Sequence, residues 1–448
     1  MQLIKGTPSQ ALWSATLGFF IGFAAVSLFG PTASKFKDIM QLSPMQVGLL
    51  VAIPALTGSL LRIPFSAWVD TSGGRKPFLT LLLLSIVGIV GLFLTVYLLP
   101  AERLGSGFYP LFLVLGVFCG CGIATFSVGI SQVSYWHPQR CQGKALAVYA
   151  GVGNLAPGLF SLVIPLALGA FGLAGSYLLW LLFLVAGTFV YAFAGCNAPY
   201  FQLLQAGKGA EQARVLAREY GQEIFPAGSL RDSLKLSARV WKTWALVAIY
   251  FTTFGGFIAL TAWFPTYWTS YFGRSVVTAG FLTALYSILT SLVRIIGGIL
   301  SDKLREGGEN TAILALFIML VGALVMTIAE RFELALPGIV LLAFGMGICN
   351  AAVFKLVPQE IPQAIGGAAG WVGGLGAFGG FVIPPAMAFA VNDLGQSGYA
   401  IGFMVFIFLA LFSFAMVWIL KYSRETIPAK GAEPLATSRM TEVASGER

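Results

Sequence analysis

Apolar runs of about one helix length, separated by short polar stretches, recur along the whole chain of 448 residues. Because the hydrocarbon core of a bilayer takes about 20 apolar residues per helix, these runs predict membrane-spanning helices. The first six predicted spans lie near residues 11–31, 46–67, 77–99, 109–133, 145–169 and 175–196. Six more lie near residues 243–264, 278–300, 311–329, 334–354, 366–390 and 398–420. The pattern predicts an all-α integral membrane protein with twelve transmembrane helices in two pseudo-symmetric six-helix halves.

The polar stretches divide the chain into four predicted parts. These are an N-terminal half at 1–196, a central loop at 197–242, a C-terminal half at 243–421 and a tail at 422–448. The tail lacks apolar periodicity and is predicted to be disordered. Twenty Lys and Arg residues lie on the side that holds both termini and five lie on the other side. Because basic loops stay on the cytoplasmic side, we expect both termini in the cytoplasm.

The central loop contains a candidate helix of its own. Ser229 and Asp232 form a capping box at the start of a short basic segment that runs to Lys242. Two interpretations remain open for this segment. It lies on the anionic leaflet through an apolar face, or it is a solvated connector between the halves. The residues of that face are Leu230, Leu234 and Val240.

Composition supports the membrane interpretation and excludes several classes of protein. The chain is 57% hydrophobic and 10% charged, against about 25% charged in soluble domains. A soluble enzyme, a disordered protein and a secreted disulfide scaffold are therefore excluded. Five scattered Cys residues and a single His predict neither a metal site nor a cofactor. The Lys and Arg residues behind the net charge of +9 lie mostly between the apolar runs rather than on one folded face, so no nucleic-acid partner is expected.

The second and eighth spans contain the same pattern. Leu56-Thr-Gly-Ser-Leu-Leu-Arg62 continues to Asp70, and Leu289-Thr-Ser-Leu-Val-Arg294 continues to Asp302. The arginine and the aspartate are eight residues apart in both copies, at the same place in each half. Parallel repeats of this kind build many transporters, whose substrate site lies near the midplane between the halves.

The two repeated arginines are predicted to lie near the middle of the membrane. Eight helical residues rise about 12 Å, and half of the hydrocarbon core is about 15 Å thick. An Arg at the centre of a span costs roughly 2.5–3.5 kcal/mol on the gentler insertion scales. All 18 acidic residues fall in loops, tails or span ends, so a substrate anion is expected to supply the missing negative charge. The alternative is that Arg62 and Arg294 only bind backbone carbonyls and clamp the bundle.

The chemistry of arginine restricts the anion but leaves a choice open. The planar, forked guanidinium suits a planar oxyanion such as nitrate, nitrite, formate or a carboxylate, and phosphate also remains possible. The positive charges of Arg62 and Arg294 disfavour sugars, drugs and cations as substrates, because none of these supplies the missing negative charge. No nucleophile, base and acid accompany the arginines, which argues against an enzyme.

The cytoplasmic ends of the two copies resemble the loop motif of the major facilitator superfamily. Gly298 and Asp302 match its Gly-x-x-x-Asp pattern. In the first half, Ser66 replaces the glycine, and Asp70 is followed by the glycines and basic residues of 73–76, which include Arg75. The resemblance implies the twelve-helix fold of that superfamily and a motif that locks the halves together in one state of the transport cycle.

Three further segments resemble the nitrate/nitrite porter family within that superfamily. They are Gly58-Ser-Leu-Leu-Arg-Ile-Pro64, Gly151-Val-Gly-Asn154 and Gly376-Ala-Phe-Gly-Gly-Phe-Val-Ile-Pro384. The second segment departs from the family at Ala156-Pro157, where glycine is usual. Proline there is expected to loosen or kink the helix and to affect gating.

The resemblance implies a role for individual residues. Arg62 and Arg294 would hold the anion, the Asn154 amide and the Tyr250 hydroxyl would donate to it, and two aromatic rings would sandwich it. These rings belong to Phe126 and Phe254. Glycines that let helices pack closely and bend are expected to gate the path. The gating candidates are Gly151, Gly153, Gly376, Gly379 and Gly380.

An empty site with two unpaired arginines is expected to resist closure, so the predicted mechanism is alternating access with obligatory anion exchange. Nitrate uptake with nitrite export is the expected pair, in a monomer in the inner cell membrane. Three alternatives stay open: a proton-coupled nitrate symporter, a transporter of another small anion, and a membrane sensor that binds the anion without transport.

Overall fold

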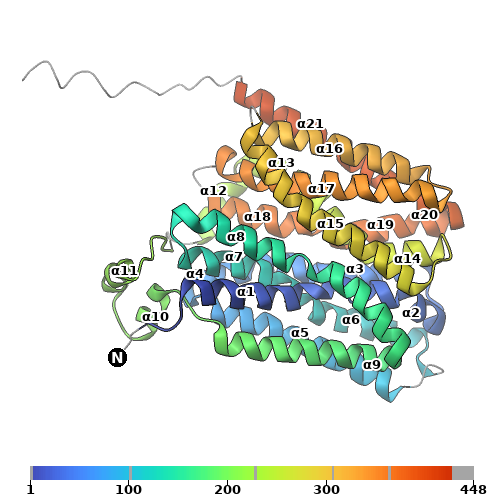
Figure 1. The fold of residues 1–448 in the computed structure, drawn as a ribbon, viewed down its shortest axis with the longest axis horizontal. Helices are drawn as coiled ribbons and strands as arrows, with labels where there is room; N and C mark the ends of the chain where they lie inside the picture. Colours follow the sequence, from blue (N-terminus) through green and yellow to red (C-terminus); the bar gives the residue numbers. More distant parts are fainter. Residues whose placement is uncertain (1–3, 100–102, 227–229, 305–306, 362–364, 426–448) are drawn as a thin grey trace, which may run out of the picture.

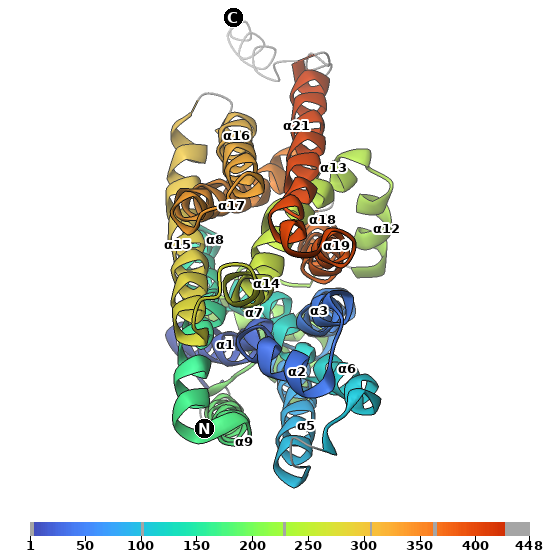
Figure 2. The ribbon, with the colours of Figure 1, turned by 90° about the vertical axis from the view of Figure 1, so that its right-hand side faces the viewer.

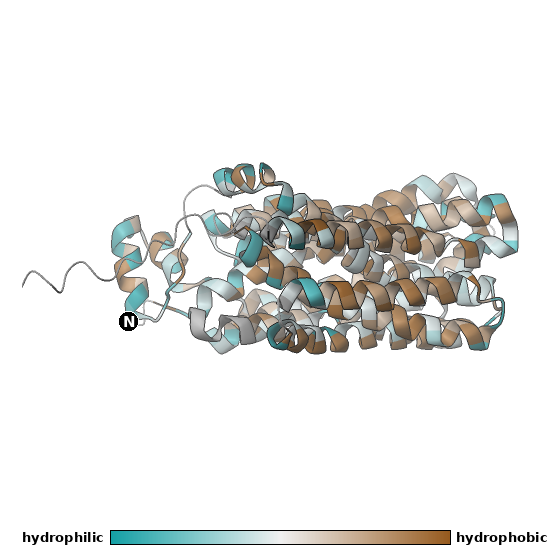
Figure 3. Cartoon of the chain, turned by 90° about the horizontal axis from the view of Figure 1, so that it is seen from above, coloured by the Kyte–Doolittle hydropathy of each residue, from teal (hydrophilic) through white to brown (hydrophobic). Residues whose placement is uncertain are grey.

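The computed structural model describes residues 4–99, 103–226, 230–304, 307–361 and 365–425. All regular secondary structure within these residues is helical. The long helices lie side by side along one direction, with the N-terminal half and the C-terminal half as two separate layers (Figure 1). Hydrophobic residues dominate the middle of the bundle and hydrophilic residues its two ends (Figure 3). This distribution is that of a bundle that crosses a membrane.

The N-terminal half contains nine α-helices and four short 3₁₀ segments at described positions. The helices are α1 (Pro8–Phe23), α2 (Ala33–Met40), α3 (Pro44–Leu60), α4 (Arg62–Ser72), α5 (Arg75–Leu98), α6 (Tyr109–Gly120), α7 (Thr125–Trp136), α8 (Gln139–Gly153) and α9 (Ala156–Ala194). The 3₁₀ segments are η1 (Ala24–Ser27), η2 (Gly30–Thr32), η4 (Ser106–Phe108) and η5 (Cys121–Ala124).

The C-terminal half begins with a helix that contains a π-helical turn. Its described elements are α13 (Trp241–Tyr250), the π turn η6 (Phe251–Gly255), α14 (Gly256–Ser270), α15 (Val276–Lys303), α16 (Gly307–Thr327), α17 (Phe332–Glu360), α18 (Ile365–Ala377), α19 (Gly379–Leu394), α20 (Gly398–Ile401) and α21 (Met404–Glu425). The last long helix, α21, starts six residues later than the predicted span and runs five residues past its predicted end. The rest of the predicted tail lies outside the described residues.

Twelve membrane passes follow from these elements. Eleven stretches of the described chain are long and apolar enough to cross a membrane, and the one at Ala145–Ala194 is 50 residues long. That stretch turns at Gly172, whose φ of 66° favours glycine. It therefore contains the fifth and sixth predicted spans, joined without a loop, and the count of twelve agrees with the sequence pattern.

The stretch predicted as one central loop is shared between the two halves. Its described helices are α10 (Pro199–Gln205), α11 (Ala210–Glu219) and α12 (Leu230–Ala238). Helix α10 adjoins the N-terminal half, where the Lys5 amide donates to Gln202 Oε1 at 2.8 Å. The segment after α11 is joined to α10 by the Tyr200 amide, which donates to Gln222 Oε1 at 2.9 Å. Figure 1 shows α10, α11 and α12 at the same end of the bundle, which we call the linker end; the opposite end is the far end.

Helix α12 packs on α18 of the C-terminal half. The Gly367 amide donates to Ser233 Oγ at 3.0 Å, and Trp371 Nε1 donates to the Leu234 carbonyl at 3.0 Å. Neither interpretation of the sequence included this contact with α18. The helix also ends at Ala238, and Lys242 belongs to α13.

The two halves press together at the far end, where glycines remove the space between backbones. A Cβ atom on Gly48 of α3 would lie 2.5 Å from the Ala388 Cβ of α19. One on Gly30 of η2 would lie 2.7 Å from the Ala262 carbonyl of α14. Seen end-on, α14, α1 and α3 meet in the centre of the molecule (Figure 2). The far end is therefore closed in this conformation.

Candidate functional site

Arg62 is buried between the two halves at a break in the second membrane pass. The break separates α3 from α4 because Pro64 has no N–H to bond the Leu60 carbonyl. Arg62 Nε donates to the Gly58 carbonyl at 3.0 Å, and Nη1 donates to the Gly373 carbonyl of α18 at 2.9 Å. The third nitrogen, Nη2, has no hydrogen-bond partner among the described residues. The two N–H groups on Nη2 of a guanidinium that is only 1% exposed are thus left for a ligand.

Arg294, the repeat counterpart of Arg62, lies in the continuous helix α15 and is half-buried. Its guanidinium carbon lies 5.9 Å from the ring centre of Phe254 and 5.8 Å from that of Phe354. Arg62 also faces Phe254, at 5.3 Å. One ring therefore contacts both guanidinium groups, and the two positive charges repel each other.

The aromatic rings around Arg62 are closer together than a sandwiched anion requires. The ring centres of Phe126 and Phe254 are 6.2 Å apart, with 31° between the planes. Arg62 lies 4.8 Å from the Phe126 centre. Two ring contacts of about 3.5 Å each add up to about 7 Å for a planar ion between the rings. The structure brings the predicted pair together, and the rings have to part by almost 1 Å to admit the ion.

Tyr250 lies against the same ring. It stacks on Phe254 with centres 4.8 Å apart and planes 8° apart. Its hydroxyl is buried: the oxygen interacts with the Arg294 side chain, and the O–H finds no acceptor among the residues that the structure describes. The charges of Arg62 and Arg294 both act on this hydroxyl. The arrangement offers a free O–H donor between two cations.

Asn154 lies at the break between α8 and α9. Its carbonyl accepts a 3.1 Å hydrogen bond from Ser291 Oγ of α15, which joins the two halves. Its side-chain Oδ1 is buried and has no partner in the described chain. A half-turn of the amide exchanges oxygen and nitrogen, so the group is free to present a donor. Pro157 is the second residue of α9, where a missing N–H is tolerated, so the helix is interrupted before it rather than kinked at it.

Among the residues that the structure describes, neither arginine has a carboxylate partner. The described ion pairs are Arg214–Glu211, Lys242–Glu360 and Lys355–Asp302, and all three lie away from the site. Within the same described ranges, no cluster of His, Cys, Asp and Glu has the composition of a metal site. The site therefore combines two cations with neutral donors and aromatic rings.

The predicted gating glycines differ in what surrounds them. A Cβ on Gly153 would overlap the Phe19 ring, and one on Gly376 would lie 2.6 Å from Tyr250 Cδ1. One on Gly379 would lie 2.5 Å from the Phe251 carbonyl, and one on Gly380 2.5 Å from Ile258 Cγ2. Gly151 has no heavy atom within 4 Å of that position. Four of the five therefore hold helices in close contact, and Gly151 faces open space.

The loop motifs make their described contacts within their own halves. Asp70 accepts a 2.6 Å hydrogen bond from the Tyr135 hydroxyl, and Arg75 donates to the Ala192 carbonyl at 2.6 Å. Asp302 pairs with Lys355 at 2.6 Å. A Cβ on Gly298 would meet no atom within 4 Å. In this conformation, the described motif residues do not lock the halves together.

Three features of the site were missed by the sequence reasoning. The π turn η6 places Phe254 one turn from Tyr250, and π turns are frequent at functional sites. Phe354 of α17 packs edge-on against Tyr250 at 5.0 Å and faces Arg294. Phe354 contacts Arg294 as Phe126 contacts Arg62. The internal repeat between the two halves was therefore the sequence signal that could have identified Phe354. Asn350, one turn before Phe354, has a buried side-chain oxygen without a described partner, and no sequence signal indicated it.

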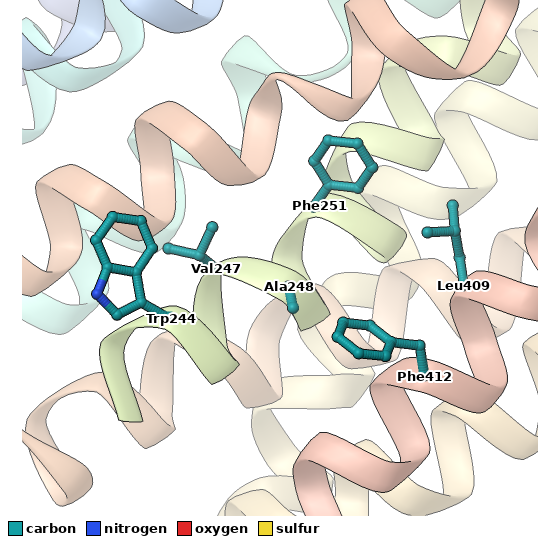
Figure 4. A pocket seen from close by; sticks show the side chains of 6 residues that line it. All are labelled: Trp244, Val247, Ala248, Phe251, Leu409 and Phe412. Carbon is teal, nitrogen blue, oxygen red and sulfur yellow. The ribbon is translucent and has the colours of Figure 1, made fainter. Parts of the chain in front are cut away.

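A recess between α13 and α21 is not part of this site. It is lined by Trp244, Val247, Ala248, Phe251, Leu409 and Phe412 (Figure 4). These side chains offer neither charge nor, apart from one indole N–H, a polar donor. The recess is therefore unsuited to an anion.

Two six-helix halves that face each other across a buried cationic site define a multi-pass membrane transporter rather than an enzyme. The chain belongs to the Major Facilitator Superfamily, whose family model matches residues 15–384. Two solved structures share the fold. A D-xylose–proton symporter matches with a TM-score of 0.70 and 14% identity, over 91% of this chain and 97% of its own. The xylose transporter XylE from E. coli, in a partially occluded inward open conformation, matches with a TM-score of 0.68 and 16% identity, over 92% and 99%.

Curated relatives with higher identity cover almost the whole chain. A protein named probable nitrate/nitrite antiporter NarK1 from Thermus thermophilus is 31% identical, over 92% of both chains. A protein named probable nitrate transporter NarT from Staphylococcus epidermidis is 29% identical, over 92% of this chain and 95% of its own. The predicted superfamily is thereby confirmed.

Proposed function

We propose that the chain exchanges nitrate and nitrite, taking up nitrate and exporting nitrite. The observation that carries the proposal is that Arg62 and Arg294, from opposite halves, face the single ring of Phe254 without an acidic partner among the described residues. Buried cations without a carboxylate favour an anionic substrate. The names of the relatives support nitrate and nitrite as that anion.

The anion is held by donors that have no other use in the site. Arg62 Nη2 and the Tyr250 hydroxyl donate to its oxygens, and Arg294 supplies the second charge. The Asn154 amide adds a donor after a half-turn. Phe126 and Phe254 move apart and cover the two faces of the planar ion. Since the fork of arginine and a slot between rings both match a plane, the site selects planar oxyanions over tetrahedral ones.

Binding is coupled to a change in which end of the molecule is open. The Gly373 carbonyl now occupies one donor of Arg62, and the anion competes for that guanidinium. Once the charge of the pair is reduced, the halves close at the linker end and part at the far end. An empty site keeps its two repelling cations and switches poorly, so one anion leaves only in exchange for another.

The linker end is the cytoplasmic side in this proposal, and both termini are cytoplasmic. The excess of 20 basic residues over five on the other side supports this orientation. Because one chain contains both six-helix halves and both arginines, the proposed transport unit is a monomer in the inner cell membrane.

Counterflow in proteoliposomes tests the proposal. Vesicles loaded with unlabelled nitrite are diluted into labelled nitrate, with and without a pH gradient. Exchange predicts uptake that needs internal nitrite or nitrate and does not depend on the gradient. Uptake that follows the proton gradient without an internal anion would identify a symporter, and nitrate binding without flux would identify a sensor. Competition by formate, acetate and phosphate measures the preference for nitrate, and displacement by one of these but not by nitrate would reject the proposed substrate.

A further inference from the structure

The far-end closure between α9 and α15 is lined by small and hydroxyl-bearing residues. A Cβ on Gly280 of α15 would strike the Ser161 carbonyl of α9, and one on Gly158 of α9 would lie 2.9 Å from Ile288 Cγ1. We call this contact the α9–α15 seam. Because it lies between the halves, it has to open whenever the site is exposed to the far end.

Ser287 stands out within the seam. It is fully buried, and its hydroxyl has no hydrogen-bond partner in the described chain. Neighbouring hydroxyls on the same helix are satisfied: Thr283 donates to the Ala279 carbonyl at 2.7 Å and Ser291 donates to the Ser287 carbonyl at 2.9 Å. The Ser287 hydroxyl instead points across the seam, since a Cβ on Gly158 would lie 3.2 Å from its Oγ.

The position of Ser287 relates it to the arginine pair. It precedes Arg294 by seven residues, which is two helical turns or about 10 Å on the same face of α15. Ser291 lies between them and reaches the Asn154 carbonyl of the other half. A buried hydroxyl without a partner is unfavourable in the closed seam, and an anion that passes along the open seam would supply the partner.

We propose that Ser287 is an anion contact on the far-end leg of the transport path, two turns outward from Arg294. When the halves part along the α9–α15 seam, its hydroxyl donates to the anion that moves between the arginine pair and the outer side. The inference deepens the proposed function and rests on it for the identity of the anion.

Thiol accessibility tests whether Ser287 lines the path. The variant Ser287→Cys is made in a background whose native cysteines are replaced by serine, and intact cells are treated with a membrane-impermeant anionic methanethiosulfonate. We expect modification from the outer side that nitrate slows. The matched control Val293→Cys lies on the same helix but faces α17, where the Val293 Cβ adjoins Gly347, and is expected to stay unmodified. Labelling of Ser287→Cys no faster than this control overturns the inference. Labelling that neither nitrate nor nitrite slows supports the path but contradicts the proposed substrate.

Transport by Ser287→Ala in the native background provides a second measurement. The half-saturating nitrate concentration is expected to rise about tenfold at the outer face, the loss of one hydrogen bond to an anion, and to change less than about twofold at the inner face. Equal changes at both faces, or a matching loss of thermal stability, would assign Ser287 a structural role and overturn the inference.

Discussion

At the scale of single residues, Arg62 combines two roles that the sequence presented as alternatives. Two of its nitrogens bind the carbonyls of Gly58 and Gly373, as a clamp would, while Nη2 stays free. A guanidinium has five donors in a rigid fork, so it can bind backbone and ligand at once. The two hydrogen bonds to carbonyls hold the guanidinium in place and so orient Nη2. They therefore support ligand binding by Arg62 rather than exclude it.

Replacing either arginine by lysine tests this reading of the pair. Lysine keeps the charge but has no fork, so Arg62→Lys and Arg294→Lys each lose at least one charge-assisted bond of about 1.5–3 kcal/mol. Nitrate exchange is expected to fall about 10- to 100-fold. Arg214→Lys, at a half-exposed surface pair, is the matched control and should exchange normally. Full activity of either site variant would contradict direct binding.

Removing the Tyr250 hydroxyl separates binding from stability. Tyr250→Phe keeps the ring that stacks on Phe254 and removes a buried O–H that has no described acceptor. Nitrate affinity should drop about tenfold or more, as for loss of a hydrogen bond to a charged group. The melting temperature without nitrate should stay the same or rise. Unchanged affinity in isothermal titration would remove Tyr250 from the site.

The repeat explains how much of this site could be predicted from the sequence. Arg62 and Arg294 stand out because they are the only basic residues inside the spans, and charge is scarce there. Phe354 follows from the same repeat once Phe126 is considered. Asn350 was not predictable, because an amide in an apolar span has no periodic signal and its lack of a partner depends on packing.

At the scale of elements, several passes depart from regular α-helix in mid-span. Breaks or turns occur at η1, at Leu61, at η5, at Asn154, at η6 and at Phe378. Proline accounts for the break at Leu61, because Pro64 lacks the N–H that would bond the Leu60 carbonyl. Interrupted helices in a membrane are tolerated only where protein or a cavity surrounds them, and the breaks at Leu61, Asn154 and η6 adjoin the candidate site between the halves.

Two glycines in these elements predict opposite responses to a methyl group. Gly376→Ala drives a Cβ into Tyr250 and should abolish measurable nitrate binding or reduce it at least tenfold. Gly151→Ala meets no atom in this conformation and should bind nitrate normally at the linker-end-open site. Binding by purified protein and counterflow are measured for both variants. Slow exchange with normal binding by Gly151→Ala would show that another conformation needs the glycine, whereas normal binding by Gly376→Ala would contradict the packing argument.

Element lengths were predictable and element details were not. Hydrophobicity determined the twelve passes, since each has to match the thickness of the bilayer. The π turn at 251–255 has no hydrophobic signature, because it changes the hydrogen-bond register by one residue inside a uniformly apolar segment. The fifth and sixth passes are likewise joined by a turn at Gly172 instead of a loop. The apolar pattern alone does not show which kind of connection is present.

At the scale of the whole molecule, the boundary between the halves lies inside the predicted central loop. The segment up to Pro226 is joined to α11 through its carbonyl, which accepts from Arg214, α10 is joined to the N-terminal half at Lys5, and α12 packs with α18. The boundary therefore falls between Pro226 and Leu230. Sequence composition could not reveal it, because both sides of the boundary are equally polar.

Splitting the chain at this boundary should preserve transport. Fragments 1–227 and 228–448, expressed together, keep α12 covalently joined to the half it packs on. Exchange by these fragments is expected to be within about threefold of the intact chain, since no described contact of α12 with α18 is cut. Fragments 1–239 and 240–448 leave α12 on the wrong piece and should be less active and less stable. Equal activity of the two pairs, measured at matched expression, would contradict the assignment of α12.

The contact of α12 with α18 also has a consequence for biosynthesis. Ser233 and Gly367 are 134 residues apart in the chain, and Leu234 and Trp371 are 137 apart. A ribosome that builds the protein from its N-terminus completes α12 long before its partner exists. The first six passes can assemble early, but α12 has to wait through four further insertions before it finds its place. Helix α12 therefore reaches its final position only near the end of translation. A chain that stops before α18 would leave α12 without its packing partner and exposed to cellular quality control.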